Sequence, residues 1–417
     1  MYRNGLMPAE AALTTRIEFV VELARRLHEY GTAAPRLEDA INHVAARLGL
    51  DCNILSTPTS IVMSFSDRQR PGSLADVTQV VRLSPGEVNL ERLCEVDEIA
   101  DRVIDGQVDL VEGRRRLRDI GALRPSLPAN LLLVAAYGVA SACVAIILRT
   151  AWPAVATAGL IGLATGAIAL GAASRPNIAA AFEAICALLA TLVATAIAVY
   201  LVPIDVRAVV IASLIVLLPG LSLTTAVREL SSQHLISGTA RMAGAMAILL
   251  KLAFGAVAAT QLGALFGWMP PPMPAASVPV WAEWAAVVAA GLAFAAMFRS
   301  PGRYYPVVIA AVVLGYVCTR VGGIFVSAPF GVFLGGLMLG AASNVFARVW
   351  KRPGALLREP GIILLVPGSV GFRTLSFVLE RDVMLGLDTA VTLLTLLIAL
   401  VAGLLFGDLL VPPRRKL

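Results

Sequence analysis

The sequence predicts an α-helical polytopic membrane protein, in which about ten transmembrane helices form two inverted five-helix repeats after a small soluble α+β domain. The first observation is composition: the 417-residue chain is 58% hydrophobic and 15% charged, with a mean hydropathy of +0.80, which excludes an ordinary soluble protein. The second is that acidic side chains gather in residues 1–127 and long apolar runs follow them. The third is a pair of Pro-Gly breaks in those runs.

Residues 1–127 are expected to form the soluble α+β domain. Helical spacing of apolar residues in Ile17–Tyr30 and Leu37–Leu48 predicts two amphipathic helices. Three β-rich segments follow, of which the first two predict a hairpin: Cys52–Leu55, Ser60–Phe65 and Thr78–Leu83. Helical patterns return in Leu90–Ile104 and Val108–Ile120.

The rest of the chain contains ten apolar stretches, and a membrane-crossing helix needs about 20 such residues. They cover roughly 129–148, 152–171, 178–202, 206–222, 242–266, 279–298, 304–319, 322–346, 357–372 and 385–411. The ninth is the weakest, because it is short and contains Arg358, Glu359 and Pro360. A Pro-rich loop at 270–280 divides the stretches into repeats of five, 128–270 and 271–417.

Loop charge predicts the orientation. With a cytoplasmic N-terminus, Lys and Arg are more numerous in inside loops than in outside loops, where they include Arg320 and Arg373, as the positive-inside rule requires. The N-terminus lacks the apolar core of a cleaved signal peptide. We therefore expect a multi-pass protein of the cell (inner) membrane with both termini in the cytoplasm. Because each repeat has an odd number of spans, the second would be inverted relative to the first.

The two breaks are Pro219-Gly220 and Pro367-Gly368, in the fourth and ninth stretches. At the offset that superimposes them, Gly238 falls on Gly386 and Gly255 on Gly403. Paired interruptions of this kind indicate a binding site at the interface of two repeats. A break inside a bilayer must have its freed backbone groups satisfied by a cavity or by neighbouring helices.

Polar residues follow both breaks and are the predicted substrate path. They are Ser222, Thr224, Thr225 and Arg228 in the first half and Ser369 and Arg373 in the second. Hydroxyls, open backbone groups and a guanidinium suit a small solute with a carboxylate, which Arg binds in a bidentate manner. The alternative is that these residues are ordinary helix ends, with both arginines facing water or lipid headgroups.

Ionisable residues within apolar stretches are candidates for proton coupling, because charge is costly in hydrocarbon. Lys251 lies mid-span and needs a partner, and we nominate Glu183 as its counter-ion or as a proton carrier. Glu183 could equally lie near the membrane interface. Asp388 could line the pathway, whereas Glu283 lies between Trp281 and Trp284 and is expected at the membrane interface.

Other functions find little support. The three histidines, His28, His43 and His234, are too scattered to predict a metal site, and no nucleotide-binding or hydrolase motif occurs. We predict no cofactor, no catalytic residue and no nucleic-acid partner, because basic residues form no stripe with interleaved aromatics. The five cysteines are expected to be reduced thiols.

Four segments, in order, resemble the threonine/serine exporter family. They are "YGTAAPRLE" (Tyr30–Glu38), "TPTSIVMSF" (Thr57–Phe65) with "SPGEVNLERLCEVDEIAD" after it, "LLPGLSLTTAVRELSSQHLISGTARM" (Leu217–Met242) and "LLVPGSVGFRTL" (Leu364–Leu375). The resemblance covers nearly the whole chain. It implies a cytoplasmic N-terminal domain before ten spans, and export of small amino acids such as threonine and serine driven by the proton motive force.

Our leading hypothesis is therefore a secondary exporter working by alternating access, with a small solute, protons and the bilayer as partners and a homo-oligomer left open. Split relatives of the family are associated with dicarboxylate export, so a succinate-like substrate is the alternative. A third hypothesis is a membrane-tethered hydrolase with its site around His28, Thr57 and Thr59. The absence of an ordered set of nucleophile, base and acid in the sequence argues against it.

Overall fold

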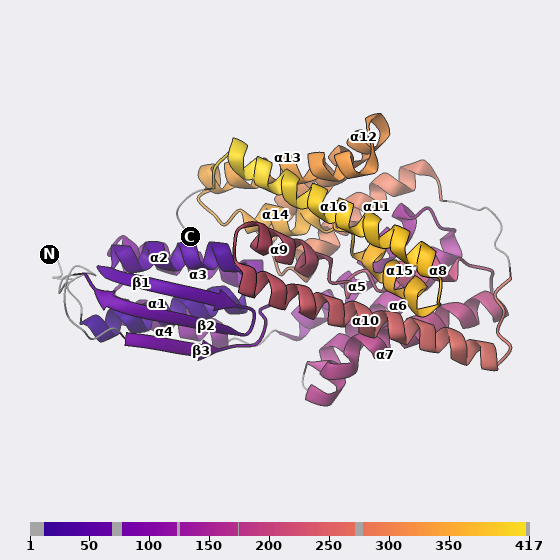
Figure 1. The fold of residues 1–417 in the computed structure, drawn as a ribbon, viewed down its shortest axis with the longest axis horizontal. Helices are drawn as coiled ribbons and strands as arrows, with labels where there is room; N and C mark the ends of the chain where they lie inside the picture. Colours follow the sequence, from indigo (N-terminus) through magenta and orange to yellow (C-terminus); the bar gives the residue numbers. More distant parts are fainter. Residues whose placement is uncertain (1–11, 69–76, 123–125, 174, 272–277, 414–417) are drawn as a thin grey trace.

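A computed structural model describes residues 12–68, 77–122, 126–173, 175–271 and 278–413 (Figure 1). An α+β region at one end of the molecule adjoins a larger assembly of helices. The end of the last long helix returns to the side where the α+β region lies (Figure 1).

The N-terminal region, residues 13–122, contains a three-stranded antiparallel sheet in the order β1-β2-β3. Its strands are β1 (Leu50–Thr57), β2 (Ser60–Asp67) and β3 (Val77–Arg82), and its helices are α1 (Leu13–Glu29), α2 (Ala34–Arg47), α3 (Leu90–Ile104) and α4 (Leu110–Ala122). Along β2, Ile61, Met63 and Phe65 are buried in alternation, as the two-residue period of a strand with one covered face requires. They share a core with Phe19 and Leu23 of α1.

Among the described residues, eight helices are long and apolar enough to cross a membrane. They are α5 (Leu127–Ile147), α6 (Trp152–Ala172), α7 (Pro176–Tyr200), α10 (Leu235–Leu265), α11 (Val280–Met297), α12 (Tyr305–Phe325, preceded by the 3-10 turn Gly302–Tyr304), α13 (Ala328–Trp350) and α16 (Val383–Leu410). The protein is thus a mostly helical, polytopic membrane protein.

The fourth and ninth predicted spans are not continuous helices. The fourth is α8 (Val206–Ser213) followed by α9 (Gly220–Ser231), and the ninth is α14 (Ala355–Ile362) followed by α15 (Gly368–Leu379). The first helix of each pair has 8 residues and the second has 12. Each second helix begins directly after a proline, whose ring and missing N–H prevent continuation of the preceding turn.

The predicted boundary between the seventh and eighth spans is wrong. The prediction placed Arg320 in a loop, yet α12 continues past Arg320 to Phe325. A single charged residue does not end a helix when it finds a partner, and Arg320 pairs with Glu283. The turn instead lies at Ser327, whose hydroxyl accepts the N–H of Phe330 and caps α13.

The two halves share backbone detail at the breaks. Pro219 has φ −78° and ψ 42°, and Pro367 has φ −81° and ψ 38°. Left-handed residues precede the long helices that follow, with φ 65° at Gln233 before α10 and φ 67° at Arg381 before α16.

The matched glycines also have matched surroundings. A Cβ atom at Gly238 would lie 2.7 Å from Cγ of Leu230, and one at Gly386 would lie 2.7 Å from Cγ2 of Val378. A Cβ at Gly255 would overlap a carbonyl oxygen of α7, and one at Gly403 a carbonyl oxygen of α13. Both sites thus need glycine for close approach of two helices.

The two Pro-Gly breaks contact each other. A Cβ atom at Gly220 would overlap Cγ1 of Val366, and one at Gly368 would lie 3.3 Å from Cα of Gly220. Leu218 and Pro367 are buried beside them. The chain is therefore tightly packed and apolar where the two interrupted segments meet.

The N-terminal region packs directly on the helical assembly. The N–H groups of Leu90 and Glu91 donate to the carbonyls of Phe298 and Arg299 at 2.9 and 3.0 Å. Leu356 of α14 joins the apolar core of the N-terminal region. These contacts fix the region against the ends of α11 and α14.

Candidate functional site

A cavity of about 280 Å³ lies where α9 and α14 meet the N-terminal region. From α9, Ser222, Thr224, Thr225 and Arg228 line it, so all four residues predicted after the first break face this space. Thr224 is nearly buried, and its hydroxyl donates to the carbonyl of Gly220 at 3.1 Å. Hydroxyls and a guanidinium therefore line the cavity immediately beyond the break.

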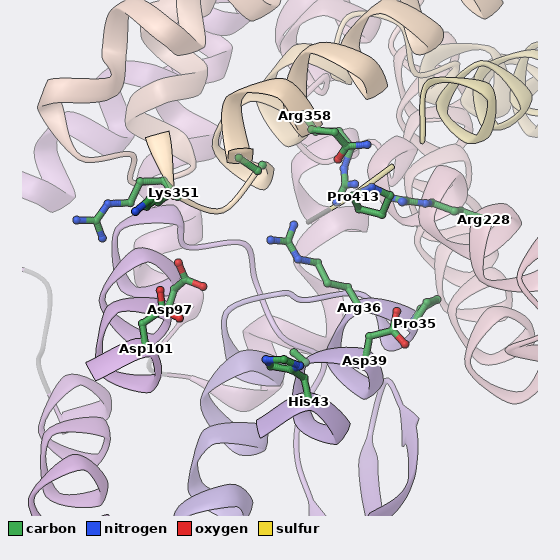
Figure 2. Close-up of a pocket in the computed structure, with 15 residues that line it drawn as sticks. Pro35, Arg36, Asp39, His43, Asp97, Asp101, Arg228, Lys351, Arg358 and Pro413 are labelled. Atoms are coloured by element: carbon green, nitrogen blue, oxygen red, sulfur yellow. The ribbon is translucent and has the colours of Figure 1, made fainter. Parts of the chain in front are cut away.

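A second cavity, of about 520 Å³, adjoins it between α2, α3 and the end of α13 (Figure 2). Three arginines line both cavities: Arg36 of α2, Arg228 of α9 and Arg358 of α14. They come from three elements far apart in the sequence. We call Arg36, Arg228 and Arg358 the arginine cluster.

Two members of the arginine cluster have carboxylate partners. Arg228 Nη2 donates to Asp408 Oδ2 at 2.8 Å, and Asn344 Nδ2 donates to the other oxygen of Asp408 at 2.7 Å. Arg358 pairs with Glu359 at 3.2 Å. Arg228 is thus at the predicted site, but its guanidinium already binds a carboxylate of the protein.

Arg36 differs from these two. Its side chain extends from α2 into the space bounded by Arg358, Arg228 and Lys351 (Figure 2), and the described residues give it no ion pair or hydrogen bond in direct contact. Burial lowers the pKa of Arg36, and the nearby charge of Arg358 lowers it further. A guanidinium nevertheless stays protonated in proteins, so Arg36 places a positive charge in the cavity.

Glu229, one residue beyond Arg228, holds α2 in place. It is fully buried and accepts the backbone N–H of Ala34, the first residue of α2, at 3.1 Å. It also accepts Ser237 Oγ at 2.9 Å and two nitrogens of Arg241 at 3.1 and 3.2 Å. An anion at a helix N-terminus satisfies donors that the helix itself cannot. One carboxylate therefore joins α9, α10 and the N-terminal region.

The second-half residues lie elsewhere. Arg373 is exposed on α15 and Ser369 is partly buried at its start, and neither belongs to the lining of the two cavities above. Pro367 and Gly368 lie at the contact between the breaks. The predicted pair Arg228 and Arg373 is not brought to one cavity.

Of the intramembrane candidates, Lys251 Nζ donates to Glu183 Oε2 at 3.2 Å, which joins α10 to α7. Asp388 is exposed on α16. Glu283, which is expected at the membrane interface, has its carboxylate buried within the protein, and only 3% of the residue is exposed. It accepts hydrogen bonds from Arg149, Tyr316 and Arg320, which offset the cost of burying a charge.

The residues of the hydrolase reading do not form a catalytic set. His28 Nε2 donates to the carbonyl of Thr57 at 3.0 Å, whereas the Thr57 hydroxyl bonds to Ser60. His28 therefore does not contact a hydroxyl that it could activate. Burial lowers the pKa of His28, which keeps the ring neutral.

Sequence reasoning missed Arg36 and Asp408 and did not assign a role to Glu229 or Arg358. Arg36 is part of the segment "YGTAAPRLE", but nothing in the sequence indicates that it reaches α9. Asp408 could have been found, because it is an acid within the last apolar stretch, as Asp388 is. The partner of Arg228 was therefore recoverable in principle.

Comparison with known proteins gives two family matches. A threonine/serine exporter family matches residues 18–263, and a second family, described as "Threonine/Serine exporter, ThrE", matches residues 283–410. Together they include the arginine cluster and both Pro-Gly breaks.

Curated relatives include fungal proteins named pheromone-regulated membrane protein 10. The protein of Zygosaccharomyces rouxii is 27% identical over 88% of this chain and 38% of its own length. That of Eremothecium gossypii is 26% identical over 87% of this chain and 50% of its own length. The chain thus spans half or less of the length of these relatives. No solved structure matches it.

Proposed function

Because the chain belongs to the threonine/serine exporter family, we propose that it is a secondary-active exporter of small amino acids resembling threonine and serine. The observation that carries this proposal is the cavity beyond the first break, lined by Ser222, Thr225 and the arginine cluster. Hydroxyl groups suit a hydroxylated side chain, and guanidinium groups attract a carboxylate. Its volume of about 280 Å³ can hold a solute of a few heavy atoms.

Transport would proceed by alternating access around the two breaks. In this mechanism the packed contact of Gly220 with Val366 and Gly368 would close the pathway between the cavity and the opposite side of the helical assembly. Interrupted helices can pivot at such points, because the backbone there is not held by a continuous hydrogen-bond ladder. We propose that α9 and α14 line the inner half of the pathway, and α8 and α15 the outer half.

The ten crossings would arise from two inverted repeats, 128–270 and 271–417, with residues 1–127 on the cytoplasmic side. Support comes from the equal lengths of the broken helices and from the near-identical dihedral angles of Pro219 and Pro367. The matched glycine contacts point the same way. Both termini would be cytoplasmic, and a homo-oligomer is compatible with this arrangement.

For proton coupling we propose Glu183, whose partner Lys251 lies on the adjacent helix. Protonation of Glu183 would release Lys251, and reprotonation cycles of this kind can drive solute exchange. Asp388 is the secondary candidate. A Glu183→Gln substitution removes the titrating group while keeping its size.

The decisive experiment is counterflow in proteoliposomes with labelled threonine, serine and succinate, with and without a pH gradient. We expect threonine and serine to exchange and a pH gradient to accelerate their export, an acceleration that Glu183→Gln removes. Exchange of succinate alone would favour the dicarboxylate alternative, which the guanidinium-rich cavity also suits. Absence of flux for all three solutes would refute the exporter proposal.

A further inference from the structure

Among the residues of the N-terminal region that line the cavity, Arg36 is the one with a positively charged side chain. It is two residues beyond Ala34, whose backbone N–H is bound by Glu229 of α9. His234 Nε2, at the start of α10, lies 3.1 Å from Glu38 Oε2, on the next turn of α2. The start of α2 is thus attached both to α9 and to the residue that precedes α10, and the position of Arg36 follows from this attachment.

Arg36 shares its cavity with Ser222 and Thr225 of the proposed substrate path. The other two arginines are each engaged by a carboxylate, at 2.8 Å for Arg228 with Asp408 and 3.2 Å for Arg358 with Glu359. Arg36 has no carboxylate in direct contact among the described residues, and its positive charge is offset only from a distance, by Asp97, Glu359 and Asp408. In a partly desolvated space such a charge attracts an anion strongly.

We propose that Arg36 binds the carboxylate of the transported solute, so that the N-terminal region supplies part of the substrate site. This inference rests on the proposed function, and it assigns to Arg36 the carboxylate contact that the sequence predicted for Arg228. Arg228 and Arg358, each paired with its own acid, instead line the cavity around the site. Glu359 lines the same cavity and offers an acceptor to the ammonium group of an amino acid.

The chemistry predicts a specific discrimination. Threoninol has the side chain and ammonium group of threonine but a hydroxymethyl group in place of the carboxylate. Loss of a charge-assisted hydrogen bond in a buried site costs about 10- to 100-fold in affinity. The protein should therefore bind threonine at least about tenfold more tightly than threoninol.

The test is equilibrium binding of L-threonine and L-threoninol to the purified full-length protein in detergent, comparing wild type with Arg36→Gln and Arg36→Lys. Arg47→Gln is the matched control, because it removes the same charge from an exposed position on the same helix. We expect Arg36→Gln to weaken threonine binding by about tenfold or more, to leave threoninol binding unchanged, and so to abolish the discrimination. Arg36→Lys should retain part of it, and Arg47→Gln all of it.

Three results would overturn the inference: a wild type that does not prefer threonine, an Arg36→Gln protein that keeps the preference, or an equal loss of both ligands. An equal loss of both ligands would mean that Arg36 has a structural role. Circular dichroism and thermal unfolding of the Arg36→Gln protein would then show a change in its fold or stability. Failure of the exporter proposal is separable. A protein that binds threonine through Arg36 but gives no counterflow would refute transport while the binding site stands.

Discussion

At the scale of single residues, Gly220 has little room for a side chain. A Cβ atom there would overlap Val366, so Gly220→Ala forces the two breaks apart, and overpacking of this kind costs about 1–3 kcal/mol. We expect a lower unfolding temperature in detergent and slower counterflow. Gly244→Ala, in α10 with no neighbour near its added Cβ, is the control and should not lower either. A Gly220→Ala protein as stable and active as wild type would show that the contact is not rigid.

The residues of the site were only partly predictable. Ser222, Thr224, Thr225 and Arg228 were found because a break inside an apolar run marks its neighbours, and all four line the cavity. Arg36 was not predicted, because the residue pattern of the N-terminal region does not indicate which membrane helix the region contacts. Arg373 does not line either cavity. It follows Gly368 by five residues, whereas Arg228 follows Gly220 by eight, so the two arginines do not occupy equivalent positions in the two halves.

At the scale of elements, the attachment of α2 to α9 and α10 depends on Glu229. Glu229→Gln leaves Arg241 without its buried carboxylate, and removal of one member of a buried ion pair costs about 3–5 kcal/mol. We expect faster hydrogen exchange at the amide of Ala34 and along the first turn of α2. Glu380→Gln is the control, because its pair with Arg207 spans 3.6 Å at an exposed site and such pairs contribute about 0–1 kcal/mol. Unchanged exchange in Glu229→Gln would contradict this role.

The eight long helices were predictable because a long apolar run has few alternatives to a membrane helix. The ends of the two broken spans were not. Hydropathy ended the fourth span at residue 222 and the ninth at residue 372, yet α9 and α15 continue to Ser231 and Leu379. The C-terminal turns of α9 and α15 contain polar residues as well as apolar ones. A hydropathy pattern does not distinguish such turns from loops.

At the scale of the whole molecule, the predicted orientation can be tested by labelling from one side. In a variant without the five native cysteines, Met269→Cys, at an exposed position beyond the end of α10, should react with a membrane-impermeant maleimide in intact cells. Arg303→Cys, in the exposed turn before α12, should react only after permeabilisation. The reverse pattern would place the N-terminal region outside the cell.

The attachment of α2 to α9 through Glu229 has a consequence for regulation. A solute held between Arg36 and the broken helices contacts two bodies at once, and therefore favours their association. A solute bound from the cytoplasm would then stabilise the contact between the N-terminal region and the membrane helices, and this contact would be weaker when the site is empty. Thermodynamic reciprocity requires the converse as well: whatever pulls the N-terminal region away, including another protein bound to its sheet, lowers the affinity for cargo by the same factor.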